Sequence, residues 1–585
     1  MSELSFLNNP PRFLFFTGKG GVGKTSVACA TSLKLVNEGK KVLLVSTDPA
    51  SNIAQVFGVQ IGNTITPIPS ADGLWALEID PEQAAAAYRE RIISPVRGLL
   101  PEAELSAMEE QLSGSCTTEI ASFNEFTDLL ANPEATVGYD HVIFDTAPTG
   151  HTIRLLQLPG SWTDFLNEGK GDASCLGPLS GLEKQRATYS RAVAALKDPS
   201  VTRLVLVSRA QTSALKEASR TLSELATIDL AGRHLIVNGV LPVEAGDDEL
   251  TLAIRRREAA ALAAMPENLR ALEQDVLPLR ISNMVGKEAL LSLLDTVSSD
   301  AILSSEPSSA MDVPHEPLRA LVDAIEADGH GLVLCMGKGG VGKTTVAAAV
   351  AAELAQRGHD VTLTTTDPAA HLSDTLQGEI EHLSVSRIDP ESAIQAYRDQ
   401  VMRSKGSKLD DVGKAALWED LQSPCTEEVA VFQQFSRAVH ESMKKFVIVD
   451  TAPTGHTLLL LDAAGSYHRE VARQMGDSMG FITPLMRLQD PVGTKVLLVT
   501  LAEPTPVSEA EELQADLRRA GINPYGWVIN NSIAAARPVS PFLQHRAENE
   551  LTEIERVRHL TDHVAIIPLM TEEPTGAARL AKVLG

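Results

Sequence analysis

The sequence has no apolar run near the roughly 20 residues that a membrane-spanning helix needs, so we expect no segment that inserts into a bilayer. The first four residues, Met1 to Leu4, carry no basic region, and no signal-like apolar core follows them. We therefore expect a cytoplasmic protein. The chain also has no C-x-x-C pair, which argues against a compact zinc or redox site. We expect free thiols at all five cysteines, which are Cys29, Cys116, Cys175, Cys335 and Cys425.

Aromatic residues are scarce at 4%, and basic residues are outnumbered by acidic ones, which gives a formal net charge of −25. This charge argues against a protein whose main partner is the nucleic-acid backbone. A hydrophobic content of 44% is ordinary for a globular protein. A chain of 585 residues is too long for one core, so two domains are expected and three or four are possible.

What the chain does contain is one glycine-rich octapeptide, present twice. Residues 18–25 read GKGGVGKT, and residues 337–344 repeat all eight letters. Each copy follows a short apolar run and precedes a stretch of small residues with helical periodicity, the order strand, glycine loop, helix. The pattern G-x-x-x-x-G-K-[ST] is a phosphate-binding P-loop, in which backbone N–H groups and the helix N-terminus bind a di- or triphosphate. We expect Lys24 and Lys343 to reach the β- and γ-phosphates, and Thr25 and Thr344 to offer hydroxyl groups to Mg²⁺.

The predicted nucleotide-binding residues are therefore those of the two loops and the residue after each: Gly18, Lys19, Gly20, Gly21, Val22, Gly23, Lys24, Thr25 and Ser26, and Gly337, Lys338, Gly339, Gly340, Val341, Gly342, Lys343, Thr344 and Thr345.

The same glycines also satisfy the dinucleotide signal G-x-G-x-x-G, through Gly18, Gly20 and Gly23. In that interpretation Asp48 would be the acid that binds a ribose. A dinucleotide fold needs neither the Lys-Thr pair nor a second identical copy, so the P-loop interpretation is favoured.

The repeat continues past the loops, through a V-x-L-x-x-T-D-P-A segment and a D-T-A-P-T-G-H segment in each half. Apolar strands separated by helical stretches predict an α/β fold with a mostly parallel sheet covered by helices on both faces. We predict two P-loop NTPase domains, at residues 1–297 and 318–585, joined by a Ser- and Pro-rich linker at 298–317. The strands expected in the first half are residues 12–17, 41–47, 73–79, 140–145, 203–208 and 234–238, and the second half should begin with a helix at 318–327.

Four aspartates follow or end strands at equivalent positions of the repeat. Asp48 and Asp367 precede proline, where a carboxylate could hold Mg²⁺ or orient the attacking water. Asp145 and Asp450 resemble the second metal-binding acid of P-loop ATPases. A turn or helix N-cap is the alternative role for an aspartate at a strand end.

Two further pairs recur. Asn238 and Asn530 end a late strand and could read adenine through their amides, or could simply form a turn. Lys19 and Lys338 are not required for phosphate binding by their own loops. They could project to a nucleotide held across an interface and stabilise transition-state charge, or they could be solvated lysines.

The two GKGGVGKT loops, the DTAPTGH segments and the duplication in one chain resemble the ArsA family of arsenite-pump ATPases. The resemblance implies that Lys19 and Lys338 reach into the opposite half's site, so that ATP and Mg²⁺ lie between pseudo-twofold halves. It also implies ATP hydrolysis stimulated by As(III) or Sb(III) and an integral-membrane efflux subunit as partner at the inner membrane. A metallochaperone that delivers As(III) is a second candidate partner.

In that family the cysteines that match Cys116, Cys175 and Cys425 are the metalloid ligands. Thiolates suit a soft ion. Cys116 and Cys425 occupy equivalent positions of the repeat, whereas Cys175 has no counterpart. His151 and His456 end the DTAPTGH segments and could add nitrogen ligands. Cys29 and Cys335 are expected to be buried core residues. A buried core position is also the alternative role for the three candidate ligand cysteines.

Two other functions remain as alternatives. A targeting chaperone ATPase for tail-anchored membrane proteins would need a large apolar groove, usually rich in methionine, and typically a C-x-x-C clasp. The chain has 12 methionines and no such clasp. A partition ATPase would need basic DNA-binding patches or a terminal amphipathic helix, and we expect neither from the acidic composition and the terminal residues AKVLG.

Overall fold

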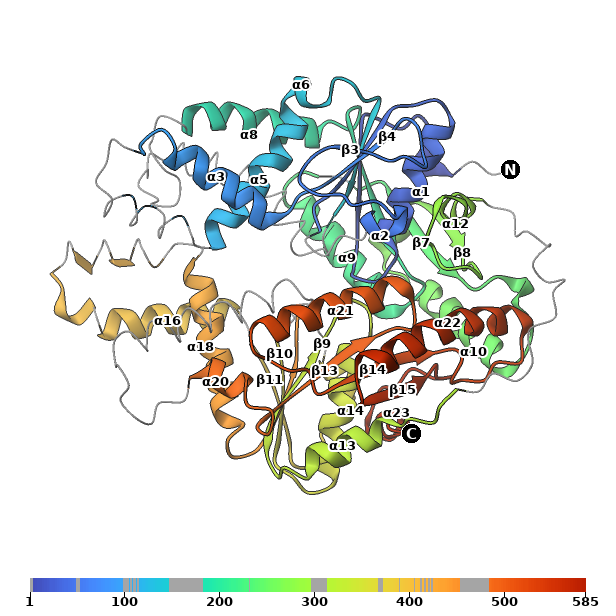
Figure 1. Ribbon diagram of the computed structural model, residues 1–585, viewed down its shortest axis with the longest axis vertical. Helices are drawn as coiled ribbons and strands as arrows, with labels where there is room; N and C mark the ends of the chain where they lie inside the picture. Colours follow the sequence, from blue (N-terminus) through green and yellow to red (C-terminus); the bar gives the residue numbers. More distant parts are fainter. Residues whose placement is uncertain are drawn as a thin grey trace. The chain divides into compact units, whose positions relative to one another are not determined.

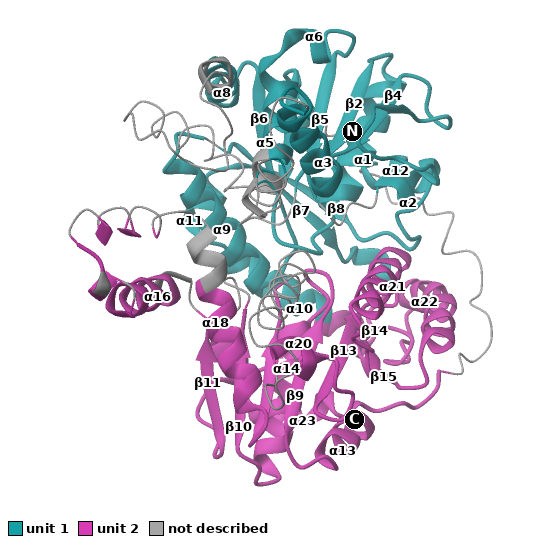
Figure 2. Cartoon of the chain, turned by 60° about the vertical axis from the view of Figure 1, so that its left-hand side comes forward, with its two compact units in different colours: residues 1–245, 254–305 teal, residues 246–253, 306–585 magenta. Residues whose placement is uncertain are grey.

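The structure is a computed structural model of the 585-residue chain, which forms two compact units (Figure 2). Residues 1–245 and 254–305 form unit 1, and residues 246–253 and 306–585 form unit 2. The residues described are 4–48, 53–97, 105, 108, 112, 115–146, 182–230, 232–295, 313–366, 372–388, 390–404, 406–410, 413–414, 417–418, 421, 425–452 and 483–585. At 115–120, 182–186, 390–391, 408 and 425–429 only the backbone is described. Most of the expected linker lies outside these ranges.

Unit 1 is built on an eight-stranded sheet with the order β3-β4-β2-β5-β1-β6-β7-β8 (Figure 1). All neighbouring strands pair in parallel except β3 and β4, which pair antiparallel. The strands are β1 (Phe13–Thr17), β2 (Val42–Ser46), β3 (Thr66–Pro67), β4 (Leu74–Glu78), β5 (His141–Asp145), β6 (Thr202–Ser208), β7 (His234–Val240) and β8 (Glu273–Pro278).

Helices cover both faces of this sheet. One core cluster joins α1, α2 and α12 to one face, and two clusters join α5, α8, α9, α10 and α11 to the other. The α-helices are α1 (Lys24–Asn37), α2 (Ile53–Phe57), α3 (Pro81–Ile93), α5 (Ser115–Ala131), α6 (Pro133–Thr136), α8 (Leu182–Lys197), α9 (Thr212–Ala226), α10 (Glu249–Ala263), α11 (Glu267–Arg270) and α12 (Lys287–Leu293), and the 3₁₀ turns are η1 (Ser5–Leu7) and η4 (Val243–Ala245).

The central strand β1 shows why this layering forms. All five of its residues are buried, and because side chains alternate along a strand, successive residues enter different layers. Leu14 and Phe16 pack with α1, whereas Phe13 and Phe15 pack on the opposite face. There the ring of Phe15 stacks on Phe144 of β5, with centroids 4.4 Å apart. A strand buried on both faces reads as a continuous apolar run, which is the pattern seen in the sequence.

Unit 2 repeats the plan with a seven-stranded, fully parallel sheet of order β11-β10-β12-β9-β13-β14-β15. Its strands are β9 (Gly331–Met336), β10 (Val361–Thr365), β11 (Leu383–Arg387), β12 (Phe446–Asp450), β13 (Thr494–Thr500), β14 (Gly526–Ser532) and β15 (Val564–Pro568). Strand by strand, this order matches that of unit 1 without β3.

In unit 2, α13, α14, α15 and α23 share one core cluster on one face of the sheet, and α18, α21 and α22 contact β12, β13 and β14. In Figure 1, α21 and α22 lie in front of β13 and β14. The helices are α13 (Leu318–Glu326), α14 (Lys343–Gln356), α15 (Leu372–Leu376), α16 (Pro390–Ser404), α18 (Cys425–Glu441), α20 (Pro484–Leu488), α21 (Pro504–Arg519), α22 (Pro541–Leu560) and α23 (Ala577–Val583), with a 3₁₀ turn η6 (Gly406–Lys408).

The predicted fold class is confirmed, because both units are α/β with a mostly parallel sheet between helical layers. The six predicted strands and the leading helix of the second half occur within two residues of their expected ends. Two strands were missed. β3 has only two residues, and β8 is an edge strand with exposed Glu273 and Gln274, so neither carries an apolar run. The pseudo-twofold relation of the halves stays a prediction.

One buried polar pair distinguishes the two units. The indole Nε1–H of Trp527, on β14, donates to Oε1 of Gln514, on α21, at 2.9 Å, and both residues are buried. At the equivalent positions of unit 1, 292 residues earlier, stand Leu235 and Leu222. We expect Gln514→Leu to leave the indole donor unpaired and to lower the free energy of unfolding by about 1–3 kcal/mol. Urea unfolding of the full chain followed by circular dichroism measures this loss.

The matched control is the same substitution in a Trp527→Phe background, which has no indole donor. There Gln514→Leu should cost little or nothing, because no buried donor is stranded. Equal losses in both backgrounds would show that the hydrogen bond does not carry the effect.

Candidate functional site

The first glycine loop lies between the carboxyl end of β1 and α1, as the sequence predicts. Gly23 is the N-cap of α1 and has a left-handed backbone with φ +91°, which favours glycine. Gly18 lies so close to the end of β6 that a Cβ there would come within 2.1 Å of the carbonyl oxygen of Val207. The loop is therefore held against the sheet and opens onto the N-terminus of α1, where N–H groups favour an anion.

The second loop has the same geometry between β9 and α14. Gly342 caps α14 with φ +93°, and a Cβ on Gly337 would come within 2.3 Å of the carbonyl oxygen of Val499. Identical sequence and matching backbone conformation give the two loops the same local geometry.

The lysine that precedes the threonine of each loop folds back over the loop. Lys24 is buried, and its ammonium donates to the carbonyl oxygen of Lys19 at 3.2 Å. Lys343 donates in the same way to the carbonyl oxygen of Lys338 at 2.9 Å. A buried ammonium group in a glycine loop at a helix N-terminus concentrates positive charge, which suits a phosphate ligand.

A hydroxyl–carboxylate pair lies beside each loop. The Thr25 hydroxyl donates to Oδ2 of Asp145 at 2.7 Å, and the Thr344 hydroxyl donates to Oδ2 of Asp450 at the same distance. Both aspartates are 1% exposed. Asp145 ends β5, which pairs with β1 so that Asp145 lies opposite Phe16. Hard oxygen ligands of this kind suit Mg²⁺, so the residues present fit a Mg²⁺–nucleotide.

The two asparagines make contacts that the sequence did not predict. Nδ2 of Asn238 donates to the carbonyl oxygen of Val22 at 2.9 Å, and Asn530 bonds to Val341 in the same way. A Cβ on Gly23 would come within 2.2 Å of Nδ2 of Asn238, so this amide packs directly against the loop. The amide therefore stabilises the phosphate loop through this hydrogen bond and this packing. Its role in adenine recognition stays a prediction.

A second supporting pair was missed from the sequence. Glu258, on α10, accepts from the backbone N–H of Leu241, just after β7. Glu550, on α22, accepts from the N–H groups of Ile533 and Ala534, just after β14. Burial raises the pKa of Glu258 and of Glu550. The internal repeat could have identified this pair, because Glu258 and Glu550 are separated by the same 292 positions as Asn238 and Asn530.

The remaining predicted residues are only partly described. Asp48 follows β2, and its backbone N–H donates to the Ser46 hydroxyl at 3.2 Å. Cys116 lies in the first turn of α5 and Cys425 begins α18, so the two cysteines occupy equivalent helix N-termini, but their side chains are not described. Asp367, His151, His456 and Cys175 lie outside the described residues.

Cys29 and Cys335 are fully buried free thiols, as expected of core residues. Burial raises the pKa of the Cys29 thiol and of the Cys335 thiol, which keeps both protonated. Within the part of the chain that the structure describes, no group of three His, Cys, Asp or Glu side chains could hold a metal ion. No described helix is long and apolar enough to cross a membrane.

Both loops and their supporting residues lie within segments matched by one protein family. The profile of the anion-transporting ATPase family matches residues 11–299, 330–488 and 467–585. The chain belongs to this family. The predicted resemblance is thus confirmed, and the repeated match agrees with two homologous P-loop domains in this anion-transporting ATPase.

Two relatives are similar to the chain over its whole length. An arsenical pump-driving ATPase of Escherichia coli is 57% identical over 589 aligned residues, which cover 100% of both chains. A protein of the same name from Acidiphilium multivorum is 56% identical over 587 residues, which cover 99% of this chain and 100% of the relative.

The position of the asparagines leads to a test. We expect Asn238→Ala to loosen the first loop and to weaken binding of ATP and GTP analogues alike, by about fivefold for one lost hydrogen bond. Isothermal titration calorimetry on the full chain measures both ligands, and Asn530→Ala tests the second loop. Asn268→Ala is the control, because that amide donates to Ser219 on α9 rather than to the loop. A loss confined to ATP would instead assign the amide to adenine recognition.

Proposed function

We propose that this chain is the ATP-hydrolysing, energy-coupling subunit of an efflux pump for As(III) and Sb(III). The observation that carries the proposal is its full-length similarity to arsenical pump-driving ATPases, together with two intact P-loops of matching geometry. The partner is an integral-membrane efflux subunit, which holds the chain at the cytoplasmic face of the inner membrane. A metallochaperone that delivers As(III) is a second candidate partner, and no nucleic acid is involved.

At each site, ATP would be bound by the loop and its buried lysine, Lys24 or Lys343. Thr25 with Asp145, and Thr344 with Asp450, would hold Mg²⁺, which supplies positive charge at the phosphates. Two carboxylates would orient the attacking water, those of Asp48 and Asp367.

Lys19 and Lys338 would each serve the nucleotide bound by the opposite half, where a cation stabilises the charge that develops on the transferred phosphoryl group. Such a lysine acts only when the halves close on the nucleotides. A metalloid that binds the closed form better than the open form would therefore stimulate hydrolysis.

The metalloid would be held by the thiolates of Cys116, Cys175 and Cys425, with His151 and His456 as additional ligands. Two observations support this choice. Cys116 and Cys425 occupy equivalent helix N-termini, and the other two cysteines are buried in the cores of their units. The DTAPTGH segment would link the sites, because it starts at the Mg²⁺ aspartate and ends at the histidine.

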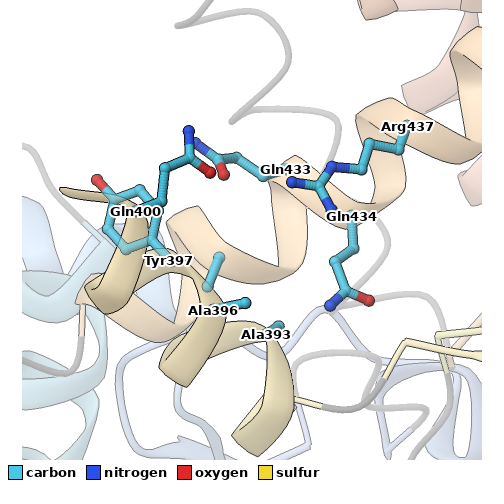
Figure 3. A pocket seen from close by; sticks show the side chains of 8 residues that line it. Ala393, Ala396, Tyr397, Gln400, Gln433, Gln434 and Arg437 are labelled. Carbon is cyan, nitrogen blue, oxygen red and sulfur yellow. The ribbon is translucent and has the colours of Figure 1, made fainter. Parts of the chain in front are cut away.

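A small hollow lies between α16 and α18 (Figure 3), and it does not fit the alternative function, a targeting ATPase for tail-anchored proteins. This small hollow is lined by Gln400 on α16 and by Gln433, Gln434 and Arg437 on α18, with Tyr397 and three alanines. An apolar membrane segment needs an apolar groove, because it cannot satisfy buried amide and guanidinium groups.

Stimulation by arsenite provides the test. We expect Cys116→Ser and Cys425→Ser to leave the basal ATPase rate unchanged and to abolish its stimulation by arsenite, because a hydroxyl is a poor ligand for a soft ion. The measurement is ATPase rate against arsenite concentration for the full chain.

Cys29→Ala and Cys335→Ala are matched controls, because both thiols are buried in the hydrophobic cores, on α1 and β9. The ATPase activity of both variants should still be stimulated by arsenite. Full stimulation of the Cys116→Ser/Cys425→Ser double variant would remove the proposed metalloid site, while the ATPase assignment would stand.

A further inference from the structure

Each P-loop packs against the end of a strand, β6 in unit 1 and β13 in unit 2. The helix after that strand carries a buried glutamate in both units. Glu217 lies on α9 after β6, and Glu509 lies on α21 after β13. Both are the sixth residue of their helix, they are 292 positions apart, and they are 5% and 4% exposed. A buried carboxylate needs a partner, so the partner each one takes is informative.

The two glutamates take different partners. In unit 1, Glu217 forms an ion pair with Arg220 on the same helix, with an N–O distance of 2.7 Å. The ammonium group of Lys19 makes no ion pair with any residue that the structure describes. In unit 2, Glu509 forms an ion pair with Lys338, whose side chain is 18% exposed. The second loop's lysine is thus attached to its own unit, whereas the structure describes no such ion pair for the first loop's lysine.

One position on the helix differs in charge between the two units. On a helix, residues i and i+3 are neighbours, so the residue three after the glutamate decides whether a cation is at hand. In unit 1 that residue is Arg220, and in unit 2 it is Glu512. With an acid in place of the arginine, Glu509 has no i+3 cation, and Lys338 takes that role. Glu512 is itself exposed.

We propose that Glu509 is a positioning residue that holds Lys338 in its own half, so that the two ATP sites of the chain are unequal. This inference rests on the proposed function, in which Lys338 serves the nucleotide of the first half. That site becomes competent only after the Lys338–Glu509 ion pair breaks. The site served by Lys19 has no such step, because Arg220 already neutralises Glu217.

Lysine reactivity tests the ion pair without relying on catalysis. Brief acetylation of the nucleotide-free full chain with an N-hydroxysuccinimide ester, followed by peptide mass spectrometry, should modify Lys19 faster than Lys338. Glu512→Arg supplies the missing i+3 cation on the helix surface, and Glu509→Gln removes the carboxylate. Both should raise the acetylation rate of Lys338 by about fivefold and leave Lys19 unchanged.

The reverse exchange is the matched control. Arg220→Glu gives unit 1 the arrangement of unit 2, so Glu217 should now bind Lys19 and slow its acetylation. Unchanged reactivity of Lys338 in both unit 2 variants would overturn the inference. Because Glu512 is exposed, Glu512→Arg remains informative even if Glu509→Gln fails to fold.

Hydrolysis then distinguishes a positioning role from a structural one. Without metalloid, Glu512→Arg should raise the ATPase rate severalfold, and Lys338→Met added to it should abolish the gain. Higher Lys338 reactivity with an unchanged ATPase rate would mean a merely structural ion pair and would overturn the inference. If Lys338→Met alone leaves hydrolysis intact, the proposed catalytic role of Lys338 fails, and the inference fails with it.

Discussion

Both candidate sites depend on the parallel pairing of two buried central strands. β1 pairs with β5 so that Phe16 lies opposite Asp145, and β9 pairs with β12 so that Cys335 lies opposite Asp450. In a parallel sheet the carboxyl ends of neighbouring strands meet at one edge. This register brings an aspartate to a glycine loop more than a hundred residues away in sequence and allows its bond to Thr25 or Thr344. A shift of one residue would turn the carboxylate to the opposite face of the sheet.

Further polar side chains stabilise each loop and the backbone near it. Asn238, at the end of β7, holds the carbonyl group of Val22, and Glu258 holds the backbone just after the same strand. Asn530 and Glu550 do the same in unit 2. The two asparagines bond directly to the backbone of a loop and so fix its conformation before a ligand arrives, whereas the two glutamates fix the segment that follows the strand. Such preorganisation is what an electrostatic site requires, because no reorganisation is then needed when charge develops.

Much of this arrangement could be predicted from the sequence because it is encoded locally. The apolar strands, the glycine loops and the leading helix 318–327 each follow from a short pattern, and the repeat identified the equivalent aspartates. Contacts between elements distant in sequence could not be predicted. Nothing near Asn238 indicates that its amide meets Val22, and nothing near Lys338 indicates Glu509. Those partners depend on how one element packs on another, which residue type alone does not determine.

The duplication shows which residues phosphate binding constrains and which it leaves free. The eight loop residues are identical in the two units, and corresponding loop glycines have similar positive φ angles in both. A short distance away the units diverge, as where Trp527 and Gln514 replace two leucines. Glu512 belongs to this second class, because it lies on the surface, yet it is one helical turn from a buried acid. A charge change at such a position alters which cation the acid binds without moving the loop. Two sites of identical loop sequence can therefore acquire different resting states through a residue that never touches the nucleotide.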